Sequence, residues 1–332
     1  MTSHWEKFKQ NNRAFYSFII FSALCVFTFS FDFISNDKPL LIKYDDAYYF
    51  PIFKKYAETE FGGDFETEAD YQDVFVQELI KREGYMIFPP FNYNFDTINY
   101  ELKTPPPSPP TASNILGTDD QARDVFARLV YGLRISLIFG FLLTIISSVI
   151  GVFLGAVSGY FGGKFDLFFQ RFLEIWSGLP VIFLLIIMAS FVIPNFWWLL
   201  LIMVMFSWMG LVGPVRAEFL KARKLEYVMA AKALGVSEFN IMIKHILPNA
   251  FVASLTFIPF ILSSSIVALT ALDFLGFGMP AGTASLGELL AQGKNNPHAL
   301  WLSLSSFFTI TLILTLIIFI GEGVRDSFNP DK

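Results

Sequence analysis

The chain has 332 residues, of which 54% are hydrophobic and 16% are charged. Charged residues make up about a quarter of a typical soluble domain, so this composition excludes an ordinary soluble protein and predicts a protein that crosses a membrane several times. The formal net charge is −5 and no basic stripe follows the sequence, which excludes a nucleic-acid partner.

The first apolar run, Phe15–Phe31, is long enough to cross the hydrocarbon core of a bilayer, which is about 30 Å thick. Basic residues precede this run, as in a secretory signal peptide, but no small-residue cleavage site follows it. We therefore expect an uncleaved anchor. Cys25 is the only cysteine in the chain, so no internal disulfide can form.

The next segment, from Asp32 to about Ala112, is too long and too aromatic to be a slack connection. It is predicted to be a small irregular folded module with one short helix around Tyr71–Arg82. The Pro-rich run Thr104–Pro110 favours an extended conformation and would act as a stiff strut. Two interpretations stay open: a packed cap on the outer face, or a docking surface for an extracytoplasmic partner.

The segment Leu116–Leu137 is predicted to form a turn and then an amphipathic helix that leads into the second span. Asp119 or Asp120 would cap this helix, because a carboxylate accepts hydrogen bonds from the free N–H groups of a first turn. Arg123 and Arg128 lie off the apolar face of the predicted helix, where long cationic side chains would reach the membrane interface.

Five further apolar runs complete a predicted set of six transmembrane helices. They are Ile135–Val157, Ile175–Ile193, Phe196–Gly213, Phe251–Leu272 and Ala299–Ile320. Lys and Arg are concentrated before the first span and in every second connection, whereas the short connections on the other side hold only Lys294. Because cytoplasmic loops carry the excess of Lys and Arg, both termini are expected in the cytoplasm.

The charged loop 214–249 joins the fourth and fifth spans and is predicted to fold. A helix over Glu218–Ala233 would end at Gly235, since glycine adopts the left-handed conformation without a steric cost. Ser237 suits the N-cap of a second short helix, and Pro248 suits the first turn of the following span. The alternative to such a helix–turn–helix projection is a basic surface loop that only obeys the positive-inside bias.

Several motifs resemble those of a known family. Ala230-Ala231-x3-Gly235 followed by Leu247-Pro248 resembles the EAA loop of permease subunits of bacterial ABC importers. Five further motifs resemble those of the branch that imports dipeptides, oligopeptides and nickel. They are Leu116-Gly117-Thr118-Asp119, Gly159-Tyr160-Phe161-Gly162-Gly163, Glu226-Tyr227-Val228, His245-Ile246-Leu247-Pro248-Asn249 and Phe274-Leu275-Gly276-Phe277-Gly278. In the outer segment, Phe61–Tyr71 and Asp96–Tyr100 resemble the extra domain of Yej-type permeases. Met229 stands where the general motif has Glu.

The resemblance implies an all-α membrane protein with the type I ABC importer permease fold. Residues 1–31 would form a cytoplasmic tail and the first helix, residues 32–115 an extracytoplasmic module, and residues 116–332 a permease core of five helices. The implied function is import of oligopeptides, including the peptide-nucleotide antibiotic microcin C, across a bacterial inner membrane. The implied partners are a second homologous permease, ATP-binding cassette ATPases, an extracytoplasmic binding protein and membrane lipid. The implied ATPase-coupling residues are Glu226, Tyr227, Ala230, Ala231, Gly235, His245, Leu247 and Pro248.

The sequence lacks a nucleotide site of its own. A phosphate-binding loop needs Gly-x4-Gly-Lys-Ser/Thr, and neither Gly163-Lys164 nor Gly293-Lys294 fits that pattern. The three histidines are scattered and no cysteines are spaced for a metal. We therefore expect no cofactor, no metal and no enzyme activity, with ATP hydrolysis on a separate subunit.

The main alternative is a secondary transporter or channel without an ATPase partner. Such transporters place ionisable groups near the bilayer midplane, and the predicted spans hold few of them. A second alternative is a membrane-anchored sensor that uses the outer module as a receptor, which would need an output domain inside.

The fifth predicted span carries four hydroxyl side chains near Pro259, namely Ser263, Ser264, Ser265 and Thr270. Hydroxyls in a helix can bond back to its own carbonyls and accommodate a kink. The other interpretation is that they line a translocation path of moderate polarity.

Overall fold

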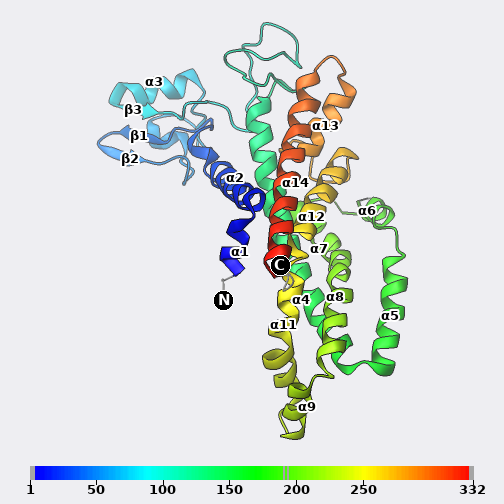
Figure 1. Cartoon of the computed structure of the whole chain (residues 1–332). Helices are drawn as coiled ribbons and strands as arrows, with labels where there is room; N and C mark the ends of the chain where they lie inside the picture. The colour runs from blue at the N-terminus through cyan, green and yellow to red at the C-terminus, as the bar shows by residue number, and fades with distance from the viewer. Residues whose placement is uncertain (1–3, 190, 193, 329–332) are drawn as a thin grey trace. The chain divides into compact units, whose positions relative to one another are not determined.

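The structure is a computed structural model that describes residues 4–189, 191–192 and 194–328. The chain divides into two compact units. The first unit consists of Ser136–Ala281 with the chain before residue 24 and after residue 307, and the second consists of Leu24–Ile135 and Gly282–Phe307. Most described residues are helical, as predicted (Figure 1).

The elements follow one another as a series of helices with one small sheet. In chain order they are α1 (His4–Gln10), α2 (Asn12–Phe29), η1 (Phe31–Phe33), β1 (Leu41–Tyr44), β2 (Ala47–Tyr49), η2 (Glu58–Phe61), α3 (Val74–Glu83), β3 (Gly84–Ile87), α4 (Val125–Phe161), α5 (Gly163–Ser177), α6 (Val181–Ala189), α7 (Phe196–Ser207), α8 (Met209–Ala222), α9 (Glu226–Ala233), α10 (Glu238–Asn240), η3 (Ile241–Ile246), α11 (Leu247–Leu255), α12 (Ile258–Phe274), α13 (Leu286–Asn295) and α14 (Leu300–Phe328).

Four helical stretches in the described part are long and apolar enough to cross a membrane, namely α2, α4, α7 with α8, and α14. A fifth candidate is the pair α5 and α6, which is bent by 62° at its break and forms either one broken span or a re-entrant loop. The apolar helix α12 has 17 residues and lies within the fifth predicted span. This count of four or five differs from the predicted six because the chain interrupts two of the predicted spans.

The two interruptions have local causes. The predicted span Ile175–Ile193 breaks after α5, where Gly178 follows the helix and Pro180 precedes α6; its residues 190 and 193 lie outside the described residues. The predicted span Phe251–Leu272 breaks between α11 and α12, and Pro259 lies in the first turn of α12. Proline is tolerated at that position because its missing N–H would have no partner inside the helix.

The module of residues 32–115 folds around a sheet that the sequence did not predict. Its strand order is β2-β1-β3, antiparallel throughout, and Ile42 at its centre pairs with Tyr49 on one side and Met86 on the other. The predicted short helix is confirmed as α3, whose N-cap Asp73 accepts a hydrogen bond of 2.8 Å from the backbone N–H of Phe75. Strands of three or four residues are too short to leave a clear alternating pattern in the sequence.

The buried side of this module is apolar and aromatic. The fully buried Phe61 forms edge contacts with Tyr44, Tyr49 and Tyr71 at centroid distances of 5.1–6.0 Å. Burying rings of this size contributes strongly to folding, because each removes a large apolar area from water. This core agrees with the prediction that the segment is folded and not disordered.

Helix α4 packs closely on α8 through a row of glycines. A Cβ added to Gly151, Gly155 or Gly159 would lie 2.4–2.9 Å from the carbonyl oxygens of Trp208, Val212 and Arg216. Both sets of residues repeat every four positions, so the two backbones approach along successive turns. Small residues at this spacing permit close helix packing in membranes, where no hydrophobic drive pulls helices together.

Candidate functional site

The predicted helix–turn–helix projection is present as α9, α10 and η3, together Glu226–Ile246, which we call the α9–η3 segment. It connects α8 to α11, and in Figure 1 α9 lies at the far end of that pair of helices. One boundary differs from the prediction: the helix expected over Glu218–Ala233 is interrupted at residues 223–225, so α8 and α9 are separate.

The turn at the end of α9 has the predicted chemistry. Gly235 has φ of +77°, a left-handed conformation that costs other residues about 1–2 kcal/mol. The N–H of Gly235 donates to the carbonyl of Lys232 (3.1 Å), and that of Val236 donates to the carbonyl of Ala231 (3.1 Å). This pair of bonds is the Schellman arrangement, which satisfies carbonyls that the helix end would leave free.

The second predicted cap is also confirmed. The Ser237 hydroxyl accepts a hydrogen bond of 3.4 Å from the N–H of Asn240 at the start of α10. Lys232 and Glu238 pair across the turn at 3.5 Å, and their side chains are 68% and 50% exposed. The turn is therefore fixed mainly by backbone geometry, since exposed ion pairs contribute little.

One face of the α9–η3 segment is buried in the first unit. Val228, Ala231, Ile241 and Ile246 belong to a core cluster that also contains Phe219 of α8. Ala231 is 8% exposed and packs against the core of this chain, whereas the neighbouring Ala230 is exposed. The segment is thus a rigid extension of the helices beneath it.

The opposite face exposes large apolar side chains. Leu234, Phe239 and Met229 are 83%, 67% and 53% exposed. Of the other predicted residues, Glu226 is exposed in the first turn of α9, and the hydroxyl of Tyr227 donates to the carbonyl of His245 at 3.4 Å.

The predicted residues Leu247 and Pro248 line an apolar cavity of about 870 Å³ in the first unit. Its other walls come from α4 and from residues such as Phe239 and Met242. These two predicted residues lie in the first turn of α11, directly after the α9–η3 segment.

The base of the segment is held by polar contacts that the sequence did not reveal. Arg216 of α8 donates two hydrogen bonds of 2.5 Å to the carboxylate of Asp166 in α5, which also accepts one of 2.6 Å from Ser158. Arg223 donates to the backbone carbonyls of Tyr160 and Phe161 at 3.0 and 3.2 Å. Charge-assisted, two-point contacts of this kind fix geometry as well as adding stability.

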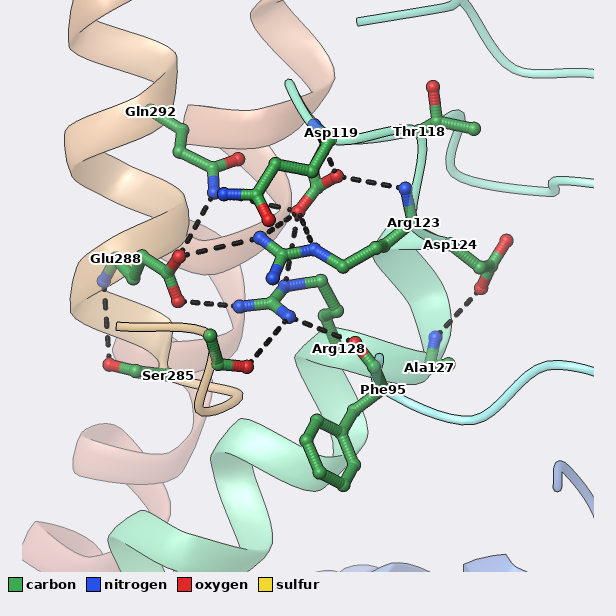
Figure 2. Close-up of polar contacts among 12 residues, drawn as sticks. Phe95, Thr118, Asp119, Arg123, Asp124, Ala127, Arg128, Ser285, Glu288 and Gln292 are labelled. Carbon is green, nitrogen blue, oxygen red and sulfur yellow. Dashed lines mark hydrogen bonds and ion pairs between the residues drawn. The ribbon is translucent and has the colours of Figure 1, made fainter. Parts of the chain in front are cut away.

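The second unit contains another polar network, which the sequence did not predict at all (Figure 2). Arg128 donates to Glu288 at 2.5 Å and lies 3.3 Å from Asp119, while Arg123 donates to Asp119 at 2.7 Å. Gln292 donates to Glu288 at 3.2 Å. Arg128 and Asp119 are both 0% exposed.

The network overturns two predictions. Arg123 and Arg128 do not reach toward an interface, because both are buried against carboxylates. Neither Asp119 nor Asp120 caps α4: the helix begins later, and the carboxylate of Asp124 accepts the capping bond of 2.8 Å from the N–H of Ala127. The signal in the sequence was the number of charges in so short a stretch, which exceeds what a capped turn requires.

Burial raises the pKa of the Asp124 carboxyl above its ordinary value. Its remaining oxygen accepts a hydrogen bond of 2.9 Å from the amide of Asn114, which counteracts part of that rise.

The hydroxyls of α12 bond to their own helix. Ser263, Ser265 and Thr270 donate to the carbonyls four residues earlier at 2.8–3.0 Å and are at most 9% exposed. Ser264 is exposed. These bonds fit the kink interpretation, and a role in lining a path stays a prediction.

The family of the chain follows from comparison with known proteins. Residues 151–332 match the model of the binding-protein-dependent transport system inner membrane component. The chain belongs to this family. It is 52% identical over 99% of its length to the inner membrane ABC transporter permease protein YejE of Escherichia coli, covering 97% of that protein. It is 50% identical over 99% of its length to the peptidoglycan transport system permease protein YejE of Agrobacterium fabrum, covering 92%.

A more distant relative matches a smaller share of the chain. The oligopeptide transport system permease protein OppC of Lactococcus lactis is 36% identical over 66% of this permease and 76% of its own length. Among solved structures, the MetNI methionine ABC transporter matches with a TM-score of 0.51 at 18% identity, covering 60% of this chain and 96% of the other, which shows the fold alone.

These comparisons confirm the ABC-importer resemblance and the type I permease fold. The chain is therefore a multi-pass inner-membrane permease, and not an enzyme, because ATP hydrolysis in such importers belongs to a separate subunit. This assignment excludes the secondary-transporter and sensor alternatives.

Proposed function

We propose that the chain is one of two permease subunits of an ATP-driven importer of oligopeptides, including peptides released from peptidoglycan. The names of the relatives support this substrate class, since they cover peptidoglycan and oligopeptide transport. Peptide-nucleotide conjugates such as microcin C belong to the same class by the resemblance of the outer segment. Of the hydroxyls of α12, the exposed Ser264 would give the path polarity without fixed charge, which suits a cargo of varied side chains.

We propose the α9–η3 segment as the place where an ATPase subunit docks. The observation that carries this proposal is its construction: one face is buried in a core and the other exposes Met229, Leu234 and Phe239. Exposed apolar side chains of this size on a capped, rigid turn are typical of a contact with another protein. Glu226 and Tyr227 would lie at the edge of this contact.

Movement of the docked ATPase would pass into the membrane through the base of the segment. Arg216 and Asp166 join α8 to α5, and the glycine row joins α8 to α4. The three helices would therefore turn together, and alternating access would follow from the displacement of one rigid group. A homologous second permease would supply the other half of the path.

The orientation belongs to the same proposal. With the α9–η3 segment in the cytoplasm, both termini lie there as well, and the module of residues 32–115 lies outside, where a substrate-binding protein would deliver the peptide. The excess of Lys and Arg on the segment's side of the membrane supports this direction.

The test uses Gly235→Val in the complete transporter, expressed with its second permease, ATPase and binding protein. Valine is strained at a φ of +77°, so the turn should change and ATPase co-purification and peptide uptake should be lost. The control is Gly276→Val, which has a similar φ of +81° and, like Gly235, open space for a Cβ among the described residues. It should lower stability equally but leave ATPase co-purification intact. Wild-type association and uptake in Gly235→Val would refute the coupling role.

A further inference from the structure

A group of exposed aromatic side chains in the second unit has no role in the transport cycle proposed above. Phe33, Phe50 and Phe53 are 48%, 46% and 75% exposed. The rings of Phe33 and Phe53 lie 6.0 Å apart, so the turn after β2 contacts the segment that follows α2. We call residues 50–55, Phe-Pro-Ile-Phe-Lys-Lys, the β2 turn.

The depth of this group relative to a bilayer follows from α2. That helix is a candidate span ending at Phe29, and Phe33 follows four residues later at the end of the 3₁₀ turn η1. At about 2 Å of rise per residue in a 3₁₀ turn, Phe33 lies within roughly 8 Å of the end of the span. The headgroup region on each side of the hydrocarbon core is about that thick. Phe53, beside Phe33, shares that level.

Both parts of the group are held by definite contacts. Next to Phe33, the carboxylate of Asp32 accepts hydrogen bonds from Tyr131 (2.7 Å) and Arg134 (2.8 Å). In the β2 turn, the N–H groups of Phe53 and Lys54 both donate to the carbonyl of Phe50, at 3.0 and 3.2 Å. The exposed rings are therefore held by a hydrogen-bonded turn and do not belong to an irregular loop.

Charge distinguishes this turn from the rest of the module. From Asp32 to Asp124 the sequence holds 18 acidic and 8 basic residues, yet the two residues after Phe53 are Lys54 and Lys55. Lys55 is 80% exposed and pairs with Glu68 at 2.8 Å, and Lys54 lies over the ring of Tyr56 at 5.0 Å. Lysines at the headgroup level are attracted by the phosphates of anionic lipids.

We propose that the β2 turn anchors the outer module to the lipid surface. Phe50 and Phe53 enter the boundary between headgroups and acyl chains, as aromatic residues do at membrane interfaces, and Lys54 reaches the phosphates. The occupant proposed is lipid and not a protein, because the exposed rings follow the end of the candidate span α2, whose last turn also exposes Val26 and Phe29, at 67% and 46%. This inference does not depend on the proposed function.

The experiment measures the depth of a nitroxide label on the full chain in nanodiscs of phosphatidylethanolamine and phosphatidylglycerol. Cys25→Ser removes the native thiol, and Phe53→Cys carries the label. The matched control is Phe65→Cys in the same module: Phe65 is 63% exposed but lies between Asp64 and Glu66, which anionic lipid would repel. A label at position 53 should collide more with oxygen than with a water-soluble nickel chelate, and a label at position 65 should show the reverse.

Lys54→Glu provides the second measurement. In the Phe53→Cys background it should move the label toward water, and the shift should be smaller in nanodiscs of phosphatidylcholine alone. The proposal is overturned if the label at position 53 is as accessible to nickel as that at position 65. It is also overturned if position 53 is shielded from both reagents, since that result would mean that protein covers the turn.

Discussion

Arg128 combines full burial with a positive charge, so its substitution tests the network of the second unit. In Arg128→Met the volume is nearly kept, but Asp119 and Glu288 lose one of their two cationic partners and keep only Arg123. Removing one member of a buried pair typically costs about 3–5 kcal/mol, and we expect a loss of that size in thermal unfolding of the detergent-solubilised protein. Arg171→Met is the control: its pair with Glu174 is 68% and 60% exposed, and exposed pairs contribute about 0–1 kcal/mol. Equal losses in the two variants would contradict a structural role for the network.

The Asp124 carboxyl gives the stability of the protein a pH-dependent component of known sign. Because burial raises its pKa in the folded state, the folded state holds more protons than the unfolded state between the two pKa values. The contribution of Asp124 to stability therefore falls as pH rises through that window and is recovered on acidification.

We test this with Asp124→Asn, which keeps the oxygen that accepts the capping bond from Ala127. On acidification from neutral pH toward the ordinary pKa of an aspartate, the wild type should gain stability relative to this variant. The measurement is urea unfolding of both proteins in detergent over that pH range. A constant difference, or one of opposite sign, would show that the carboxyl is not desolvated.

At the scale of elements, the row of glycines on α4 predicts opposite effects for two chemically identical substitutions. Gly155→Ala places a Cβ 2.9 Å from the carbonyl oxygen of Val212, and overpacking of this kind costs about 1–3 kcal/mol. Gly213→Ala, on α8, meets no atom of the described residues within 4 Å, so alanine's helix preference of about 0.5–1 kcal/mol should appear as stabilisation. Thermal unfolding in one detergent compares them, and a stabilised Gly155→Ala would contradict the close approach of α4 and α8.

The elements that the sequence predicted well are those fixed by local chemistry. Gly235 and Ser237 define the end of α9 and the start of α10 because each satisfies backbone groups of its own turn. The charged residues of the second unit were misinterpreted because their partners are distant in sequence: nothing near Arg128 indicates that Glu288 will lie beside it. The same holds for Asp166 and Arg216, which come from two helices.

For the whole molecule, the proposed orientation predicts which surfaces a membrane-impermeant maleimide reaches. In a Cys25→Ser background, Tyr100→Cys in the outer module and Met229→Cys in α9 place thiols at residues that are 87% and 53% exposed. The first should be labelled in intact spheroplasts, and the second only after the membrane is opened. Labelling of Met229→Cys in intact spheroplasts would reverse the orientation, and with it the side on which an ATPase docks.

The order in which the network of the second unit is completed has a consequence for biogenesis. Arg128 lies in the first turn of α4, yet its partner Glu288 is synthesised 160 residues later. Until α13 emerges from the ribosome, the guanidinium of Arg128 can pair with Asp119 but not with Glu288. Nascent chains that stop before α13 should therefore stay incompletely assembled at the translocon and be preferred substrates for membrane-bound proteases.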